Sequence, residues 1–457
     1  MIETFTKKAD EYLDSAVMLL SQLISFPSVL GEAEEGAPYG RNCAEVLKFA
    51  EETLEDEFTV KNFDNHVITV SFNDEPAALG ILAHLDVVPV DGQQWTSDPF
   101  TADIRDGRIY GRGSIDDKGP AVAVITAMRI IKDMGLPVKN NCRLILGSNE
   151  ENGFSDIEYY QTKEAFPPML FTPDGDFPVV TGEKGMIRYE YTGTYDGGDI
   201  ISLDGGSVVN AVPERAEAVI RCVSPCSAKQ LAEKYEGIVF DVEADGEYLK
   251  IAAKGTGAHA STPGLGKNAL TALMSLLCSL DLKGGLADSV RLLSSLYPYG
   301  ELHGESAGIF MEDERSGSIT SVLSLARCED GKFSFMTDTR FPLSARCSDI
   351  VPVMDEKSGG TGRAVYLSEP HDAGDDSDFV KTLLSVYEDC TGNKGECLII
   401  GGGTYVHHTE NGVAFGADWD GTNHMHGADE FIRLDELKRD IIIYAETIYR
   451  LCCSAER

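Results

Sequence analysis

Apolar positions recur at helical spacing at the start of the chain and in short strand-like runs after it. Over residues 9–26 they fall three and four apart and stop before Pro27, which predicts an amphipathic helix. Residues 41–54 predict a second helix, and the strongly apolar stretch 120–134, which Pro120 opens, predicts a buried one. Short strands are predicted at 58–61, 67–72, 79–82 and 142–146. Strands that alternate with helices over roughly 175 residues predict a mostly parallel α/β sheet.

The pattern changes near Gly182 and stays different for about 185 residues. Residues 187–194 and 216–223 alternate as strands do, and 238–253 is typical of a hairpin. Helical periodicity resumes at 376–390. We therefore predict an α/β domain in two pieces with an inserted α+β domain between them. The predicted bounds are 1–183 and 368–457 for the two pieces, and 184–367 for the insert.

Composition narrows the class of protein. The chain has 457 residues, more than one ordinary domain, and 42% of them are hydrophobic, which is enough for real cores. Its 75 acidic and 39 basic residues give a formal charge of -36, which disfavours nucleic acids and anionic membranes as partners because both need basic patches. There is no CxxC pair among the 11 cysteines, no signal-peptide pattern and no membrane-length apolar stretch. We expect a cytoplasmic protein with free thiols.

Two adjacent acids, Glu150 and Glu151, follow the predicted strand 142–146. The carboxyl ends of parallel strands are where α/β proteins place their ligands. Adjacent side chains of an extended segment point to opposite sides, so one acid can bind a metal while its neighbour moves a proton. The alternative is a solvated acidic turn, which is common in a chain this acidic.

Other possible metal ligands stand at predicted strand ends or turns: His84 with Asp86, Asp116, Asp174, and the pair His424 and His426. Each has a structural alternative, namely a hydrogen-bonded core histidine, a helix N-cap, a turn cap, or a surface His-x-His on one face of a strand. Together they form a mixed imidazole and carboxylate set that suits zinc, with manganese or cobalt as alternatives. Two such ions can share one carboxylate and one water. Asp86 can then orient the His84 ring, and one glutamate stays free as a base.

Five motifs, in this order, resemble the dinuclear zinc peptidases of the aminoacylase and glutamate-carboxypeptidase type. They are His84-Leu85-Asp86-Val87-Val88-Pro89, Gly111-Arg112-Gly113-Ser114-Ile115-Asp116-Asp117-Lys118-Gly119-Pro120, Glu150-Glu151, Thr172-Pro173-Asp174 and Met425-His426-Gly427-Ala428-Asp429-Glu430. Asp-Lys-Gly-Pro, the long insert and Gly-Gly-Gly-Thr-Tyr at 401–405 are most similar to the bacterial PepV-like dipeptidases. The resemblance covers essentially the whole chain, and Ala83, where that family usually has glycine, is a small departure.

The resemblance implies a role for each motif residue, with the α/β domain as the catalytic domain and the insert as a lid. The implied metal ligands are His84 and Asp174 for one ion, Glu151 and His426 for the other, and Asp116 bridging the two. The family pattern favours Asp116 over Asp117, and His426 over His424. Glu150 would be the general base, and Asp86 would orient His84.

Positions in and after the insert also match the family. His259 resembles the histidine that reaches from the lid to the scissile carbonyl, and Asn210 and Arg340 resemble residues that hold the substrate. Arg340 can bind a free carboxylate with two parallel hydrogen bonds, although an arginine at a strand end is often only a surface residue. The loop Gly401, Gly402 and Gly403 can offer backbone N–H groups to the same carboxylate, or can be a plain turn.

The implied activity is hydrolysis of dipeptides that carry a free C-terminal carboxylate. A water bridging two zinc ions would attack the peptide carbonyl, and Glu150 would take its proton and then protonate the leaving amine. One alternative is an N-acyl-amino-acid deacylase, because its substrates also carry that carboxylate. An alternative of another class is a non-catalytic metal-binding or peptide-binding protein. The long insert indicates a site covered within one chain, so we expect a monomer.

Overall fold

The computed structural model describes residues 1–221 and 224–453, and the chain divides into two compact units. The first unit comprises Met1–Gly182, Asp372–Leu398 and Gly403–Arg457, and the second comprises Glu183–His371 and Ile399–Gly402. Each unit has its own sheet and its own hydrophobic core. That these units act as a catalytic domain and a lid stays a prediction.

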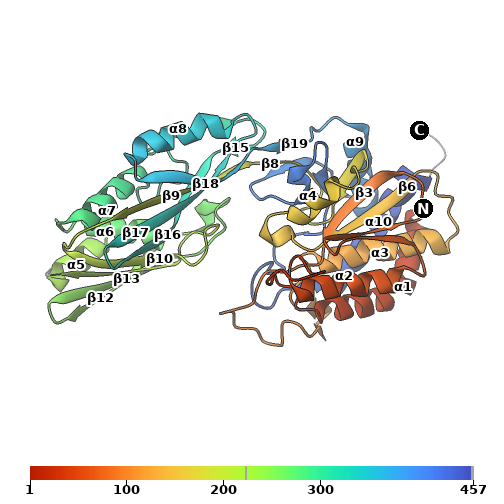
Figure 1. Ribbon diagram of the computed structural model, residues 1–457, viewed down its shortest axis with the longest axis horizontal. Helices are drawn as coiled ribbons and strands as arrows, with labels where there is room; N and C mark the ends of the chain where they lie inside the picture. The colour runs from red at the N-terminus through yellow and green to blue at the C-terminus, as the bar shows by residue number, and fades with distance from the viewer. Residues whose placement is uncertain (222–223, 454–457) are drawn as a thin grey trace. The chain divides into compact units, whose positions relative to one another are not determined.

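The sheet of the first unit is parallel at its centre and antiparallel towards both edges (Figure 1). Its strands run in the order β1-β2-β6-β3-β7-β21-β8. Their bounds are β1 (Thr59–Phe63), β2 (Val67–Ser71), β3 (Ala77–His84), β6 (Asn141–Gly147), β7 (Met169–Thr172), β8 (Val179–Glu183) and β21 (Val413–Ala414). The predicted α/β class is confirmed, and the parallel pairs are β6 with β3, β3 with β7, and β7 with β21.

The central strands are buried on both faces, as expected for parallel strands covered by helices. Leu144 and Leu146 of β6 belong to one apolar cluster, whereas Ile145 between them belongs to another. The larger cluster packs under α1 (Ile2–Ile24), α3 (Lys118–Asp133) and α10 (Leu434–Ile448). The smaller cluster includes residues of α4 (Ser155–Gln161) and of the 3₁₀ helix η3 (Tyr405–His408). Because burial holds the strands on both faces, their carboxyl ends are held in fixed positions.

The other elements of the first unit include a small sheet that brings distant motifs together. In that sheet β22 (Phe431–Arg433) pairs with β5 (Arg108–Tyr110), which pairs with β4 (Asp103–Arg105). The segment that carries His426 therefore lies beside the segment that carries Asp116. The remaining elements are α2 (Arg41–Leu54), α9 (Asp378–Thr391) and the π-helical η4 (Tyr449–Cys453). Two further strands, β19 (His371–Asp372) and β20 (Cys397–Ile400), pair with β8, and each has residues in both units.

The second unit is an eight-stranded antiparallel sheet with helices packed on it, which confirms the predicted α+β class. Its strand order is β12-β13-β11-β10-β16-β17-β9-β18. The strands are β9 (Gly185–Thr194), β10 (Ile200–Gly205), β11 (Arg215–Arg221), β12 (Val239–Asp245), β13 (Tyr248–Lys254), β16 (Thr320–Glu329), β17 (Lys332–Phe341) and β18 (Gly362–Ser368), with a ribbon of β14 (Glu312–Asp313) and β15 (Gly317–Ser318). The helices are α5 (Pro225–Ala232), α6 (Ala269–Cys278), α7 (Gly285–Leu296), α8 (Cys347–Ser358) and the 3₁₀ helix η2 (Pro263–Leu265). The end of the predicted strand 216–223 lies outside the described residues.

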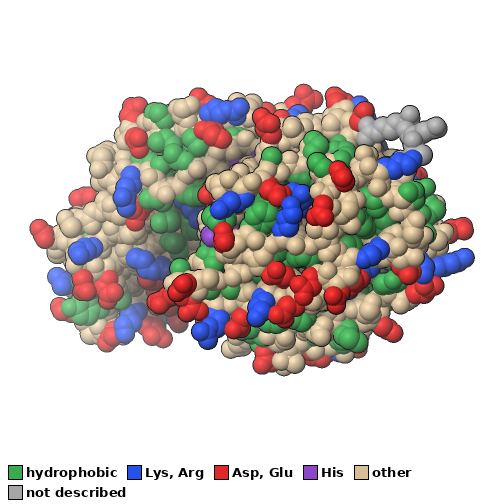
Figure 2. Space-filling model, turned by 45° about the vertical axis from the view of Figure 1, so that its right-hand side comes forward, with side chains coloured by type: hydrophobic (Ala, Val, Ile, Leu, Met, Phe, Trp, Pro, Cys, Tyr) green, Lys and Arg blue, Asp and Glu red, His purple; other side chains and the backbone are tan. Residues whose placement is uncertain are grey.

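The surface carries the charge that the composition implies. Figure 2 shows acidic side chains interspersed with basic ones over the face that it draws. Among the described residues, every cysteine is a free thiol, as predicted. No helix in the described part of the chain combines the length and apolarity that crossing a bilayer requires.

Candidate active site

Three neighbouring parallel strands end at the same edge of the first sheet, and each end carries a predicted site residue. β3 ends at His84, which pairs with Gly147 at the end of β6. The 3₁₀ helix η1 (Glu150–Asn152) follows β6, and Asp174 lies two residues beyond the end of β7. Because parallel strands present their carboxyl ends together, these side chains meet at one edge of the sheet.

The five predicted ligands form one cluster around Asp116. Asp116 Oδ1 lies 3.0 Å from His84 Nε2, and its Oδ2 lies 2.9 Å from His426 Nε2. Glu151 Oε2 is 3.2 Å from His426 Nε2, and Asp174 Oδ2 is 3.7 Å from His84 Nε2. One carboxylate therefore faces both imidazoles, and each imidazole also faces a second carboxylate.

The donor set fits divalent cations. His84 Nε2 is buried and makes no directed hydrogen bond within the described residues, although two carboxylate oxygens lie close to it. Glu151 Oε1 is also buried and unpartnered in that part of the chain. Unpaired buried acceptors are costly, and a cation between imidazole and carboxylates would satisfy them. Two ligand groups have all their donor atoms within 4.8 Å of one another: His84 with Asp116 and Glu151, and His84 with Glu150 and Asp174.

The electrostatics of the cluster also call for positive charge. Burial, with the charge of Asp174 added, raises the pKa of Glu150 well above its ordinary range. Burial and the Asp116 charge raise the pKa of Asp174 to about 7. Loss of solvent lowers the pKa of His426, but the carboxylates of Glu151 and Asp116 outweigh it and raise that pKa to about 12. The cluster thus holds protons where metal ions would otherwise supply the charge.

Asp86 holds the cluster in place through hydrogen bonds to His84 and to the glutamate pair. Its backbone oxygen lies 3.0 Å from His84 Nδ1, closer than its carboxylate Oδ1 at 3.4 Å. The carboxylate accepts the N–H groups of Glu150 and Glu151, at 3.1 and 3.2 Å. Asp86 therefore contacts both the histidine and the glutamate turn. The extended backbone predicted for Glu150 and Glu151 is wrong, because both N–H groups turn towards one carboxylate and the pair begins a 3₁₀ helix.

The two rejected neighbours lie outside the cluster. Asp117 holds the N-cap position of α3 without capping it, and its Oδ2 accepts the backbone N–H of His84 at 3.1 Å. His424 is exposed, and its Nδ1 faces the backbone oxygen of Ala428 at 3.3 Å. His424 and His426 do not lie on a strand, so the alternative of a His-x-His on one strand face does not hold. Both have positive φ in a loop, so their rings share no strand face.

Sequence reasoning did not predict the buried ion pair that joins the two loops of the cluster. Arg112 Nη1 donates to Glu430 Oε2 at 2.5 Å, and both side chains are buried. Glu430 Oε1 accepts the N–H of Ile115 at 3.1 Å, while Arg112 Nη2 donates to the backbone oxygen of His426 at 3.2 Å. Arg112 lies in the motif 111–120 and Glu430 in the motif 425–430, and their opposite charges were the one feature of the sequence that could have suggested an ion pair. Only the fold shows that they meet.

The predicted substrate-binding residues of the second unit lie on neighbouring segments. Gly403, the last residue of the glycine loop, belongs to the first unit. Ala211 and His259 form an isolated β-bridge, so Asn210 and His259 lie on neighbouring segments. Arg340 is only 2% exposed, which excludes the surface-residue alternative. It pairs with Asp338 through Nε at 2.5 Å and Nη2 at 3.0 Å, and its Nη1 donates to the backbone oxygen of Gly401 at 2.5 Å.

The glycine loop approaches this group closely. A Cβ at Gly401 would lie 2.4 Å from the Cβ of Ser261, whose hydroxyl is 2.6 Å from His259 Nδ1. Glycine at this position therefore lets the loop approach the His259 segment and still accept a hydrogen bond from Arg340. The loop offers the Gly401 carbonyl to Arg340, and binding of a substrate carboxylate by the loop N–H groups stays a prediction.

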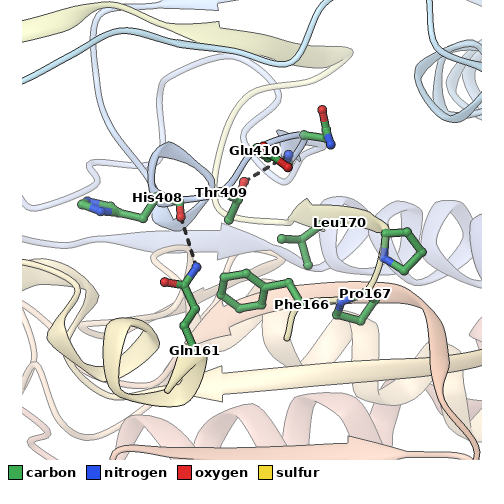
Figure 3. A pocket seen from close by; sticks show the side chains of 10 residues that line it. Gln161, Phe166, Pro167, Leu170, His408, Thr409 and Glu410 are labelled. Carbon is green, nitrogen blue, oxygen red and sulfur yellow. Dashed lines mark hydrogen bonds between the residues drawn. The ribbon is translucent and has the colours of Figure 1, made fainter. Parts of the chain in front are cut away.

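A separate cavity of about 480 Å³ lies in the first unit (Figure 3). Its lining includes Phe166, Pro167 and Leu170 on one side and His408 and Thr409 on the other. None of the predicted metal ligands lines it. His408 is half-buried, and its ring packs against the Phe154 ring.

Comparison with known proteins agrees with this arrangement. The model of peptidase family M20/M25/M40 matches residues 80–450. A "Beta-Ala-Xaa dipeptidase" of Lactobacillus delbrueckii subsp. lactis is 35% identical over 98% of this chain and 98% of its own length. Among solved structures, human carnosine dipeptidase 1 has the same fold, with a TM-score of 0.60, 15% identity and 98% coverage of each chain.

The dipeptidase Dug1p of Saccharomyces cerevisiae also shares the fold, with a TM-score of 0.61 and 14% identity over 100% of this chain and 99% of its own. The resemblance predicted from the five motifs is thus confirmed at the level of the family, and the PepV-like subtype stays a prediction. Because the family model spans every predicted metal ligand and most of the chain, the protein belongs to peptidase family M20/M25/M40 and is a hydrolase of the peptidase type.

Proposed function

We propose that this peptidase hydrolyses dipeptides in a metal-dependent reaction. The observation that carries the metal site is the position of Asp116, whose two oxygens face two different imidazoles at 3.0 and 2.9 Å. A carboxylate so placed can bridge two cations. The dipeptide substrate is supported by the names of the relatives, which include a Beta-Ala-Xaa dipeptidase and human carnosine dipeptidase 1.

The residues that would hold two ions are His84 and Asp174, Glu151 and His426, and the shared Asp116. Zinc suits this mixed set, and manganese or cobalt are alternatives. When bound, such ions supply Lewis acidity that acidifies water and polarises a carbonyl. Asp86 keeps the His84 ring oriented and the glutamate turn in place.

Glu150 is proposed as the general base. Its carboxylate is buried beside the proposed metal ligands, where it can take a proton from water and return it to the leaving amine. Its position also permits a different role, because its carboxylate groups with His84 and Asp174. His259, Asn210 and Arg340 stay predicted contacts to the substrate carbonyl and carboxylate.

A four-substrate comparison tests the function. We expect the metal-loaded protein to cleave Ala-Ala, and to leave N-acetyl-alanine and Ala-Ala-amide uncleaved, because they lack the free amine and the free carboxylate respectively. β-Ala-Ala tests whether the preference that names the Lactobacillus relative holds here. Release of amino acid is measured by chromatography. Faster cleavage of N-acetyl-alanine would assign the deacylase alternative instead, and no turnover with bound metal would favour the binding protein.

Metal removal is expected to make stability depend on pH. Asp174 has a folded pKa near 7, above its ordinary 3.8, so the metal-free fold binds an extra proton between those values and loses stability as pH rises through them. His426 acts in the same direction above pH 6.5, since its folded pKa is about 12. We therefore expect the Tm of chelated protein to fall from pH 5 to pH 8, measured by calorimetry.

The direction in which the Tm of metal-free protein changes with pH decides the outcome of this experiment. Added metal replaces the protons, so the Tm gain on reloading should be larger at pH 8 than at pH 5. Asp174→Asn is the matched control, because it removes the acid whose pKa is raised to about 7 and should flatten the metal-free profile below pH 7. A metal-free Tm that rises with pH would contradict the proposed charge arrangement.

A further inference from the structure

Four successive backbone N–H groups, from Ser148 to Glu151, each donate to a buried carboxylate. Ser148 and Asn149 donate to Asp156 Oδ2 at 2.7 and 2.9 Å. The next two N–H groups, those of the glutamate pair, donate to Asp86. The turn that presents the glutamates is therefore held by two acids. Asp86 also contacts His84, whereas Asp156 contacts none of the proposed metal ligands by its side chain.

Asp156 is itself held by a residue from a distant part of the chain. The Tyr405 hydroxyl donates to Asp156 Oδ2 at 2.5 Å, and the other oxygen accepts the N–H of Ile157 at 2.8 Å. Both Asp156 and Tyr405 are buried, at 0% and 1% exposure. A buried carboxylate with four donors is fixed in place, because losing any of them leaves a charged group poorly solvated.

Tyr405 touches the cluster a second time through its ring. The ring meets the His84 ring edge to face, with centroids 6.1 Å apart and planes at 87°. One side chain thus contacts a proposed ligand with its ring and, through Asp156, the turn that carries Glu150 and Glu151 with its hydroxyl.

Gly147 makes this arrangement possible. A Cβ at this position would lie 1.9 Å from the Tyr405 hydroxyl oxygen and 2.4 Å from Asp156 Oδ2. The end of β6 therefore has no room for a side chain at this position, because the Tyr405 hydroxyl and the Asp156 carboxylate occupy that space. The glycine, the aspartate and the tyrosine form one fitted unit directly behind the glutamate turn.

We propose that Asp156 and Tyr405 are positioning residues, which set the Glu150 and Glu151 carboxylates by holding the N–H groups of Ser148 and Asn149. This inference rests on the proposed function, in which Glu150 is the base and Glu151 a metal ligand. The pair acts on the two glutamates through the backbone of the turn, and the Tyr405 ring also contacts the His84 ring. Loosening the turn displaces the base from the reacting water, which lowers kcat, and leaves the substrate-binding residues in place.

The test compares two buried tyrosines of the same apolar cluster. Tyr405→Phe removes only the hydroxyl that binds Asp156 and keeps the ring against His84. Tyr160→Phe is the matched control, because its buried hydroxyl accepts from Arg143 at 3.0 Å and, within the described part of the chain, makes no hydrogen bond to residues 148–151. Asp156→Asn is a second variant, which keeps the shape of the side chain and removes its charge.

Metal-loaded protein is used to measure hydrogen exchange of the peptide that contains residues 148–151, and kcat and KM for Ala-Ala. Metal-free protein is used to measure manganese affinity by calorimetric titration. For Tyr405→Phe we expect exchange about tenfold faster, manganese binding severalfold weaker and kcat about tenfold lower, with KM within about twofold. Asp156→Asn should change all of these further. Tyr160→Phe should change each by less than about twofold, even with a similar loss in Tm.

Equal changes in exchange and manganese affinity for the two tyrosine variants would overturn the inference, since both hydroxyls would then only stabilise the fold. An unchanged exchange rate at 148–151 in both Tyr405→Phe and Asp156→Asn would overturn it as well. Failure of the proposed function is a distinct result, in which wild-type protein cleaves no dipeptide. Exchange and manganese affinity still decide the positioning role in that case, because neither needs turnover.

Discussion

Replacing Glu150 by glutamine is expected to lower kcat for Ala-Ala by about a thousandfold or more, while the chain keeps two metal ions. Glutamine has nearly the same shape but cannot accept the proton of the attacking water. Glu150 is buried and its N–H is held by Asp86, so the substituted side chain stays in place. Steady-state kinetics and elemental analysis of the same purified sample measure both quantities.

Glu151→Gln provides the control for this substitution. Its carboxylate faces His426 at 3.2 Å, so we expect the loss of about one metal ion per chain together with activity. Comparing metal content and activity of the two variants separates the two roles that the geometry allows for Glu150, general base and metal ligand. If Glu150→Gln instead loses a metal ion, then Glu150 is a ligand of the group that contains His84 and Asp174, and the base must be another residue.

Asp116→Asn is expected to abolish binding of the metal pair and to reduce activity by at least about a thousandfold. Among the residues that the structure describes, Asp116 is the one carboxylate that lies within 3.0 Å of both imidazoles, at 3.0 Å from His84 and 2.9 Å from His426. An asparagine can offer an oxygen to one of them only, and its amide nitrogen would face the other. Metal content by elemental analysis and affinity by titration measure the loss.

Asp117→Asn is the neighbouring comparison. Its Oδ2 accepts the His84 N–H at 3.1 Å, and an amide oxygen can do the same, so metal content should stay near two per chain. Asp117 contacts neither imidazole nitrogen in the described structure. Loss of metal from Asp117→Asn with retention in Asp116→Asn would reverse the assignment of the bridging ligand.

The spacing of hydrophobic residues predicted which segments are helices and which are strands, but it predicted the ends of these elements less accurately. The predicted helix 41–54 coincides with α2 (Arg41–Leu54), because its buried residues recur at helical spacing along one face from Cys43 to Leu54. The first helix begins at Ile2 rather than at residue 9, since Phe5 packs into the core among polar neighbours that hide the period. β3 continues past the predicted residue 82 to His84, because pairing with Gly147 extends the strand through a polar residue.

Site residues divide in the same way. The ligands and the proposed base stand in short local motifs, so sequence alone could name them. The residues that hold them could not be named from local pattern. Arg112 meets Glu430 across 318 residues, and Tyr405 meets Asp156 across 249. A lone buried charge has no local signal, because its partner is identified only once the chain has folded.

By itself, the sequence determined the α/β and α+β classes, the acidic character and the candidate residues for metal binding and proton transfer. These follow from side-chain type and short-range spacing. The tertiary structure decided that Asp116 rather than Asp117 faces both imidazoles, that the glutamate pair begins a 3₁₀ helix, and that Arg340 is buried. Each of these three features depends on where strand ends and loops meet. Hydrogen bonds and burial between residues far apart in the sequence decide those positions.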